Sequence, residues 1–316
     1  MRISVVCCTY DPALYDAFRE AADSVLAQTH EDRELVIVID GDRDLADRVE
    51  SDYDDREDVL LHCNDRNIGL LASRNRGAEL ASGEVVAFID DDAVADPEWL
   101  AELDATYAAH DALAAGGRMT PEWVAGEPRF LPAEFHFLVG VTHRGFAEGS
   151  REVRNTFGSN ISVRRDVFEN LGGFDTAIGG RKGDSHLQGG ETELGARLRA
   201  EYGCGVQYNP DALVAHKVFA YRTDPTWLAK RAFWQGYSKR AMAVLLPEPG
   251  GEESAFLSRL LTEFVPGRLR RLAANPSRRR AEQLFVLVLL TACVGFGYVY
   301  GALRYARFSG RTVNEG

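Results

Sequence analysis

Three consecutive aspartates, Asp90, Asp91 and Asp92, follow the apolar run VVAFI at residues 85–89. Adjacent carboxylates repel one another, and burial of an unpaired charge is costly, so a compensating group is expected beside them. A divalent cation such as Mg²⁺ or Mn²⁺ would provide it, because these ions prefer carboxylate oxygens as ligands. A solvated turn before a helix is the alternative, since aspartate also caps helices and Pro97 suits a first helical turn.

Two other apolar runs of strand length end in residues of the same kind. RISVVCC is followed by Thr9, Tyr10 and Asp11, and ELVIVI is followed by Asp40 and Asp42. Continuous apolar runs that alternate with helical patterns predict an α/β fold, with a mostly parallel, Rossmann-like sheet flanked by helices. Ligands of such sheets bind beyond the carboxyl ends of the strands. Three polar strand ends together therefore favour a ligand site over three separate helix caps.

Composition narrows the classes of partner and chemistry. The 316 residues carry a formal net charge of -12, and only four of the 36 basic residues are lysines. An acidic, lysine-poor surface is typical of proteins that work at high salt, where self-repulsion is screened, and it disfavours nucleic-acid binding.

The first turn has no G-x-G-x-x-G pattern and the chain has no G-x-x-x-x-G-K-[ST] loop, which disfavours nicotinamide and P-loop chemistry. The five cysteines lack zinc-site spacing and do not form an even disulfide framework.

The C-terminal region contains a candidate membrane segment. Residues 284–303 form a run of 20 residues without a charge, with three arginines on each side. Its length predicts a helix that spans a membrane, and a buried core helix is the alternative. Upstream, residues 256–273 alternate apolar and basic residues, which favours an interfacial amphipathic helix or a helix packed on the globular part. The opening MRISVVCCTYDP turns polar too early for a signal peptide, so we expect the N-terminal part to be cytoplasmic.

Five segments in this order resemble the family 2 glycosyltransferases of GT-A fold and together cover roughly residues 2–216. They are SVVCCTYDP, VIVIDGD, NIGLLASRNRGAELASGEVVAFIDDDA, GSNISVRRDVFENLGGFD and GGETELGARLRAEYG. The resemblance implies an inverting enzyme that uses a nucleotide sugar together with Mn²⁺ or Mg²⁺. A divalent cation suits this chemistry because it stabilises charge that builds on a diphosphate leaving group.

The resemblance also implies roles for individual residues. Asp92 of the D-x-D element and His216 would bind the metal, although a structural histidine is an equal alternative for His216. Three of the residues that would bind the nucleotide sugar have a structural alternative: Tyr10 as a packing aromatic, Arg74 as a surface arginine and Asn160 as a turn residue. The residues that match nucleotide-sugar-binding positions are Thr9, Tyr10, Asp40, Arg74, Asp90, Asp91, Ser159 and Asn160.

An inverting transfer to a hydroxyl needs a general base beside the attacking oxygen. By resemblance this base is Glu191, which falls where the family commonly has an aspartate; Glu193 is the second candidate, or else a first-turn carboxylate that satisfies helix amides. Arg181 lies beside Lys182 in a glycine-rich segment that we expect to cover the site. The residues expected near the acceptor or the diphosphate are Lys182, Arg231, Trp234 and Gln235, and the alternative for Trp234 is a core residue.

The expected layout has four parts. Residues 1–240 form the catalytic domain, with a nucleotide-sugar half at 1–118 and an acceptor half at 119–240. They are followed by a linker with an interfacial helix at 241–283, a membrane helix at 284–303 and a tail at 304–316. Within the family this layout is similar to haloarchaeal enzymes that transfer glucuronate from UDP-glucuronate to a dolichyl phosphate-linked sugar for protein N-glycosylation. That similarity implies a single-pass protein of the cell membrane.

Two alternative functions remain open. In a polyprenyl-phosphate glycosyltransferase, which would use UDP-glucose or another nucleotide sugar, the lipid phosphate itself attacks and no strong base is needed. A membrane-tethered scaffold that keeps the fold without catalysis would bind no nucleotide with a metal.

Overall fold

The computed structural model describes residues 1–178, 181–182, 185–246 and 252–309. The chain divides into two compact units, and each is built from separated stretches of sequence. The first unit comprises residues 1–122, 147–180 and 190–217, and the second comprises 123–146, 181–189 and 218–316. Three stretches that we expected in the catalytic domain, 123–146, 181–189 and 218–240, therefore group with the C-terminal helices.

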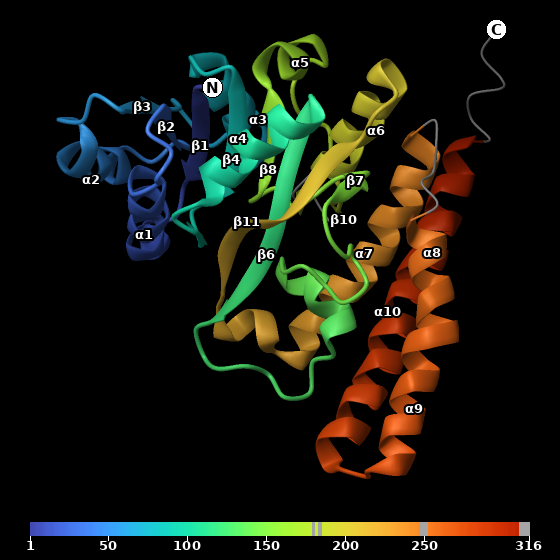
Figure 1. Ribbon diagram of the computed structural model, residues 1–316. Helices are drawn as coiled ribbons and strands as arrows, with labels where there is room; N and C mark the ends of the chain where they lie inside the picture. Colours follow the sequence, from blue (N-terminus) through green and yellow to red (C-terminus); the bar gives the residue numbers. More distant parts are fainter. Residues whose placement is uncertain (179–180, 183–184, 247–251, 310–316) are drawn as a thin grey trace, which may run out of the picture. The chain divides into compact units, whose positions relative to one another are not determined.

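One mixed sheet organises the first unit (Figure 1). Its strands follow the order β3-β2-β1-β4-β8-β6-β11-β5, and the short β7 pairs with β11. The pairs that β1 forms with β2 and β4, and the pair of β2 with β3, are parallel. The pairs of β8 with β4 and β6, and of β11 with β5 and β7, are antiparallel. The α/β prediction is confirmed, but only the first half of the sheet is parallel. The strands are β1 (Ile3–Thr9), β2 (Arg33–Ile39), β3 (Val59–Cys63), β4 (Val85–Asp90), β5 (Ala93–Ala95), β6 (Ala114–Trp123), β7 (Arg151–Val153), β8 (Ile161–Arg164) and β11 (Val206–Val218).

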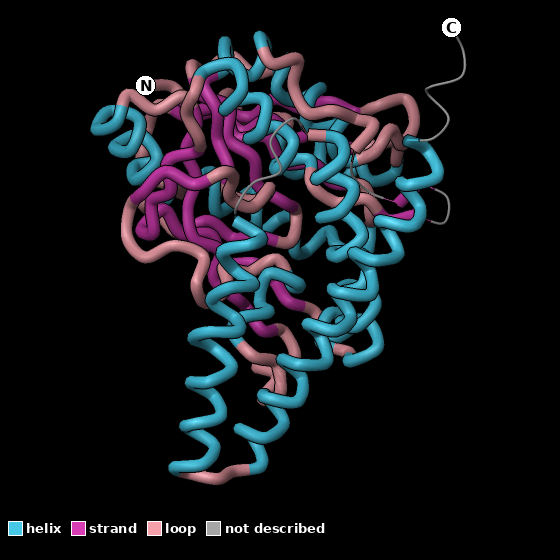
Figure 2. The backbone as a smooth tube through the Cα atoms, turned by 90° about the vertical axis from the view of Figure 1, so that its right-hand side faces the viewer, coloured by secondary structure: helices cyan, strands magenta, loops and turns pink. Residues whose placement is uncertain are grey.

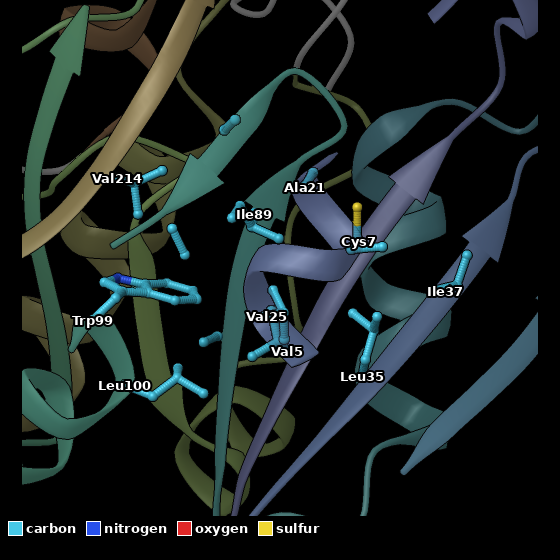
Figure 3. Close-up of a cluster of buried hydrophobic side chains, with 14 of the residues drawn as sticks. Val5, Cys7, Ala21, Val25, Leu35, Ile37, Ile89, Trp99, Leu100 and Val214 are labelled. Atoms are coloured by element: carbon cyan, nitrogen blue, oxygen red, sulfur yellow. The ribbon is translucent and has the colours of Figure 1, made fainter. Parts of the chain in front are cut away.

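Helices cover one face of the parallel half. After β1, the turn η1 (Pro12–Leu14) leads into α1 (Tyr15–Leu26), and α2 (Arg43–Tyr53) and α4 (Trp99–His110) follow β2 and β5. Alternate residues of β1, β2 and β4 point to this face, because side chains alternate across a strand. Figure 3 shows Val5, Leu35 and Ile89 from three strands in one cluster with Val25 of α1 and Trp99 of α4. Such burial is the main stabilising contribution to a fold of this kind.

The opposite face is covered by α3 (Leu70–Leu80) and α5 (Arg165–Asn170). Gly77 allows α3 to lie close to the sheet, because a Cβ there would come within 2.4 Å of the Val6 side chain. Phe88 of β4 packs against Phe168 and Phe174, with ring centroids 5.4 and 5.1 Å away. The helix α6 (Gly190–Tyr202) completes the unit and leads into β11.

The second unit is mostly helical. Leu287 and Leu290 of the last helix pack in its core with Leu228 and Phe264. Pro266 follows a π-helical turn at the start of the next helix, and the helical course of the chain continues through it. The elements of the second unit are η2 (Ala133–Val139), the short strands β9 (Arg181–Lys182) and β10 (Ser185–His186), η3 (Ala220–Thr223), α7 (Pro225–Leu245), α8 (Glu252–Arg259), the π-helical turn η4 (Leu260–Phe264), α9 (Val265–Ala274) and α10 (Arg278–Ser309).

The helix α10 contains the apolar segment that the sequence singles out. Residues Arg278–Tyr305 are long and apolar enough to cross a membrane, and most of this stretch is exposed. Figure 1 shows α10 running beside α7 and α9, and Figure 2 shows α9 and α10 as two helices joined by a short loop. An exposed apolar helix of this length is weak evidence for membrane attachment, because length and composition alone do not establish it.

Candidate active site

The polar ends of β1, β2 and β4 meet at one edge of the sheet. In the parallel register Thr9 lies opposite Ile39, and Cys8 lies opposite Asp90. The backbone N–H of Asp40 donates to the carbonyl of Thr9 at 2.8 Å. The parallel strands thus bring together residues that are separated by up to 82 positions, as expected for the carboxyl edge of such a sheet.

Asp40 organises the loop that leads into α3. Its carboxylate accepts hydrogen bonds of 2.9 Å from the Asn64 amide and from the backbone N–H groups of Ile68 and Gly69. Gly69 has φ of +89°, a conformation that glycine adopts without strain. The Asn64 amide also donates to Ser73 Oγ of α3 at 3.0 Å. Asp40 therefore fixes the start of the helix that carries Arg74.

Arg74 bridges two carboxylates from distant segments. Its side chain is 2% exposed, and its Nη2 donates to Asp90 Oδ1 at 2.5 Å while its Nη1 donates to Glu191 Oε1 at 3.0 Å. The guanidinium carbon lies 5.9 and 5.7 Å from the ring centroids of Phe88 and Phe174. Burial alone would lower the pKa of Arg74, but the charges of Asp90 and Glu191 raise it above its ordinary value. Arg74 is thus a buried, permanently charged residue and not the surface arginine of the alternative interpretation.

Gly158 makes room for this ion cluster. A Cβ at position 158 would lie 2.0 Å from Glu191 Oε1 and 2.7 Å from Arg74 Nη1. Any side chain there would have to displace the carboxylate of Glu191. Sequence analysis did not single out Gly158, although its place directly before Ser159 and Asn160 was a usable signal.

Asp92 and His216 form a second buried pair. Nε2 of His216 lies 3.3 Å from Asp92 Oδ1, and both side chains are buried. The antiparallel pairing of β11 with β5 places His216 opposite Ala93, and the backbone N–H of Lys217 donates to the Asp92 carbonyl at 2.8 Å. Within the described residues, no three histidine, cysteine or acidic side chains gather as a complete metal site. The protein thus offers two ligands of the types that Mn²⁺ and Mg²⁺ accept, and diphosphate oxygens of a donor would complete the coordination.

Asp91 adds a carboxylate with one unpartnered oxygen beside this pair, and its hydrogen bond with Thr9 offsets only part of the rise in its pKa. Burial, and then repulsion from Asp92, raises its pKa to about 7. Its Oδ2 is buried and makes no hydrogen bond with any described residue. A buried oxygen without a partner and a raised pKa both indicate excess negative potential, which a bound cation would offset. The residues present therefore fit a divalent cation.

The side chains of Ser159 and Asn160 form hydrogen bonds with groups inside the first unit. Ser159 Oγ accepts from the backbone N–H of Asp90 at 3.0 Å. Asn160 Oδ1 accepts from Trp99 Nε1 and from the Gly117 N–H, at 2.9 and 3.0 Å. Its amide group donates to the carbonyls of Arg118 and Ala212, at 3.2 and 2.9 Å. All four hydrogen bonds of the Asn160 side chain are thus used internally, so the structure does not support our expectation that Asn160 faces the donor.

The two candidate bases have different surroundings. Glu193 is buried and forms a two-pronged ion pair with Arg197, with both distances 2.5 Å. Arg197 in turn donates to the carbonyls of Leu171 and Gly173. Glu191, two residues earlier and so on the other side of α6, is partly exposed and shares the Arg74 cluster with Asp90. This geometry favours Glu191 as the base and gives Glu193 a structural role.

The remaining predicted site residues are Tyr10, which is exposed in the first unit, and the four acceptor candidates, which lie in the second unit. Tyr10 is 58% exposed just beyond β1, which does not fit a packing aromatic. Arg231 Nε donates to the Leu138 carbonyl at 3.4 Å, and the Trp234 ring lies 5.4 Å from that of Phe233. Gln235 is partly buried on α7. Lys182 and its neighbour Arg181 form β9, but their side chains lie outside the described residues. These four acceptor candidates, Lys182, Arg231, Trp234 and Gln235, all belong to the second unit.

A sheet whose strand ends carry a D-x-D element, with a histidine beside it and a carboxylate from a following helix, defines a glycosyltransferase of GT-A fold. The chain belongs to glycosyl transferase family 2, whose sequence profile matches residues 4–172. It is therefore an enzyme of sugar transfer.

Two curated relatives show the range of the similarity. The glucosyl-dolichyl phosphate glucuronosyltransferase of Haloferax volcanii is 51% identical over 304 residues, which cover 96% of this chain and 97% of the relative. The succinoglycan biosynthesis protein ExoM of Rhizobium meliloti is 28% identical over 75% of this chain and 73% of its own. The similarity to the Haloferax protein includes the C-terminal helices.

Solved structures share the fold at low sequence identity. The mannosyltransferase PcManGT from Pyrobaculum calidifontis, in complex with GDP-Man and Mn²⁺, superposes with a TM-score of 0.56 at 18% identity, covering 92% of this chain and 86% of its own. TarS 1–349 of S. aureus with UDP-GlcNAc gives a TM-score of 0.54 at 14% identity, covering 97% and 92%. These likenesses support the fold assignment.

Proposed function

We propose that this enzyme transfers glucuronate from UDP-glucuronate to a hydroxyl of a dolichyl phosphate-linked sugar, with inversion, for protein N-glycosylation. The observation that carries the proposal is the 51% identity to a glucosyl-dolichyl phosphate glucuronosyltransferase along nearly the whole of both chains. The geometry of the first unit supports the proposal.

Glu191 acts as the general base in this proposal. It is partly exposed, so a hydroxyl can approach it, and Arg74 holds its Oε1 in place. The remaining carboxylate oxygen accepts the proton of the acceptor hydroxyl as that oxygen attacks the sugar carbon. Arg74 also holds Asp90 at the donor side, so that one guanidinium sets the positions of both carboxylates.

Asp92 and His216 would hold a divalent cation, either Mn²⁺ or Mg²⁺. When bound, such an ion stabilises the negative charge of the diphosphate leaving group. Thr9, Tyr10 and Asp40 line the strand ends where a nucleoside would bind, and Asp91 lies between the two flanking aspartates. Ser159 supports this edge by its hydrogen bond to the Asp90 backbone.

The acceptor suits an enzyme that works at a membrane. We propose attachment to the cell membrane through the C-terminal helices, with the catalytic unit on the cytoplasmic side. In this arrangement Lys182, Arg231, Trp234 and Gln235 of the second unit serve the lipid-linked acceptor or the diphosphate.

Mass spectrometry of lipid-linked glycans tests the proposal. Membranes that contain the enzyme would be incubated with UDP-glucuronate, UDP-glucose and other nucleotide sugars, and a mass increase of one hexuronate is expected from UDP-glucuronate alone. Transfer of another sugar would refute the donor assignment. Full activity of Glu191→Gln with a lipid phosphate as acceptor would instead favour the polyprenyl-phosphate alternative. A folded chain that binds no nucleotide with either metal would favour the scaffold.

A further inference from the structure

An apolar stripe runs along one side of α10. Phe285, Phe296 and Leu303 are 67%, 70% and 66% exposed. Their neighbours on the stripe recur at three- and four-residue spacings, which place them on one face of a helix. From residue 285 to residue 303 the stripe is about 27 Å long, at 1.5 Å per residue. Its exposed members are Phe285, Val288, Leu289, Phe296, Val299 and Leu303.

Another side of α10 is fixed to α7. A Cβ at Gly297 would lie 1.8 Å from the Phe233 carbonyl oxygen, and one at Gly236 would lie 1.9 Å from that of Val294. Only glycine permits this approach, so the two helix backbones meet directly. Farther along, the Arg240 guanidinium lies 5.8 Å from the ring centroid of Tyr298. A Cβ at Gly301 would lie 3.0 Å from Cβ of Arg240, so the helices stay in contact about one turn past the glycine crossing.

The beginning of α10 is fixed by a buried polar network. Glu134 of η2 is fully buried and accepts from Arg268 of α9 at 2.5 and 3.1 Å. Arg268 also donates to Gln283 of α10 at 3.0 Å, and Gln283 donates to the Arg129 carbonyl at 2.9 Å. Breaking a buried ion pair of this kind is strongly unfavourable, so α9 and α10 remain attached to η2.

These contacts conflict with the single membrane crossing that the sequence suggests. If residues 284–303 crossed the hydrocarbon layer, the part of α7 packed along them would have to enter it too. Charged side chains at that depth are expensive unless they are paired or reach water. An orientation in the membrane plane inserts only the stripe and leaves α7 in water. The charged residues of α7 are Lys230, Arg231, Lys239 and Arg240.

Positive charge gathers next to the stripe. Five arginines surround the turn between α9 and α10, in a chain whose net charge is -12. Two of them form surface ion pairs, Arg278 with Glu282 and Arg279 with Glu127, which contribute little in exposed positions. Clustered arginines beside an apolar helix face favour anionic lipid head groups. The five are Arg270, Arg271, Arg278, Arg279 and Arg280.

We propose that α10 lies in the plane of an anionic membrane surface, with its apolar stripe inserted in one leaflet, and does not cross the bilayer. The arginines of the α9–α10 turn contact the lipid phosphates. Tyr300, which is 42% exposed and lies at the edge of the stripe by its helical position, suits the interface because its ring is apolar and its hydroxyl is polar. The proposal does not depend on which sugar the enzyme transfers.

Topology of the full chain provides the first test. The chain would carry one epitope tag at each end, and sealed spheroplasts of the expressing cells would be treated with external protease. Both tags should resist digestion until detergent opens the cells, and both should be digested in inverted vesicles. Loss of the C-terminal tag alone in sealed spheroplasts would establish a crossing and overturn the proposal.

Vesicle flotation of the purified full chain provides the second test. Binding to vesicles with 30% phosphatidylglycerol should fall about tenfold or more when three stripe residues are made polar, because the inserted apolar area is lost. The variant is Phe285→Ser, Phe296→Ser, Leu303→Ser. The matched control makes three other exposed residues polar, Val124→Ser, Tyr202→Ser, Tyr221→Ser, and should float like the unchanged chain.

Three measurements keep this test decisive. Circular dichroism and UDP binding with Mn²⁺ verify that the stripe variant is folded, because UDP is expected to bind in the first unit. Equal flotation of the stripe variant and the control would overturn the proposal. A further result would also overturn it: the unchanged chain sediments as a dimer, the stripe substitutions abolish the dimer, and the unchanged chain does not bind vesicles. The stripe would then pack against a second copy of the chain. Vesicle binding without hexuronate transfer would leave this proposal standing and refute only the donor.

Discussion

Nη1 of Arg74 lies 3.0 Å from Oε1 of Glu191, although the two residues are 117 positions apart in the sequence. The same guanidinium contacts Asp90 at 2.5 Å through its other terminal nitrogen. Since Arg74 is almost fully buried, its charge depends on these two carboxylates for compensation. The candidate base and the first aspartate of the D-x-D element are therefore held by one side chain. A substitution that moves one of these carboxylates should also change the position of the other.

Replacement of Arg74 by methionine should both destabilise the fold and abolish transfer. Removal of the cation leaves two carboxylates with mutual repulsion, and we expect a loss of about 2–4 kcal/mol, reduced because both carboxylates are partly exposed. Urea unfolding measures the loss, and hexuronate transfer measures activity. Arg76→Met on the same helix is the control, because its ion pair with Glu79 is exposed and should change the unfolding free energy by under about 1 kcal/mol. Equal losses in the two variants would contradict the bridging role.

Gly158→Ala should separate activity from stability. The new methyl group must displace the carboxylate end of Glu191, which is flexible, so the cost in stability should stay near or below about 1–2 kcal/mol. Transfer should fall about 100-fold, because the base no longer lies where Arg74 holds it. Steady-state kinetics should show the fall in kcat with little change in KM for the donor. Gly267→Ala, whose methyl meets nothing closer than 3.9 Å, should keep full activity.

Asn160→Ala should act on the fold and not on donor affinity. The substitution leaves the Trp99 N–H and the carbonyls of Arg118 and Ala212 without this partner, while the Gly117 N–H keeps its 3.4 Å bond to the backbone carbonyl of residue 160, and we expect a cost of about 2–4 kcal/mol. Calorimetric titration with UDP and Mn²⁺, at a temperature where the variant is folded, should give an affinity close to that of the unchanged enzyme. A large loss of UDP affinity in the folded variant would instead indicate that Asn160 contacts the donor.

Asp92→Asn and His216→Gln should weaken nucleotide binding only when a divalent cation is present. Each variant removes one of the two proposed ligands, so UDP affinity with Mn²⁺ should fall by about 10–100-fold, a loss we take from the effects of altering a metal's ligand sphere. In EDTA the variants and the unchanged enzyme should bind UDP equally weakly. Asp96→Asn, whose side chain contacts only the Glu98 backbone in the described interactions, is the control. Metal-independent weakening in both variants would argue against the cation site.

His143 should make the enzyme less stable in mild acid. Burial, and then the charges of Lys239, His136 and Arg259, lowers the pKa of His143 to about 3. The unfolded chain takes up a proton below its ordinary pKa of about 6.5 while the folded chain does not, so stability is complete above that pH and falls as the pH drops towards 3. The slope is up to about 1.4 kcal/mol per pH unit. His143→Phe, placed among Phe137, Phe146 and Phe256, should reduce the acid sensitivity, as followed by urea unfolding at pH 7, 6 and 5.

The sequence predicts the parallel half of the sheet well, because its strands are continuous apolar runs. The same logic places Thr9, Asp40 and Asp90 together, since carboxyl ends of adjacent parallel strands share an edge. The antiparallel half is not predictable in this way. Its strands β8 and β11 contain Ser162, Asn209 and His216, which are buried polar residues that satisfy partners elsewhere in the fold.

The local details of the site depend on contacts that spacing does not encode. Arg74 could have faced water on α3, and only Phe88, Phe174 and the two carboxylates make burial favourable. Asn160 resembles a donor ligand in sequence, and only the structure reveals the four internal partners of its amide. Gly236 and Gly297 look like weak positions within helices, because the close approach they permit is visible only when α7 and α10 lie together.

The first unit ends at residue 217, directly after His216, which is carried by the long strand β11. During translation the nucleotide-binding sheet thus has all its strands while the last third of the polypeptide is still to be made. The strands of the first unit are therefore complete before the apolar helix α10 is synthesised. If α10 binds a lipid surface as we propose, that attachment would follow the synthesis of every strand of the first unit.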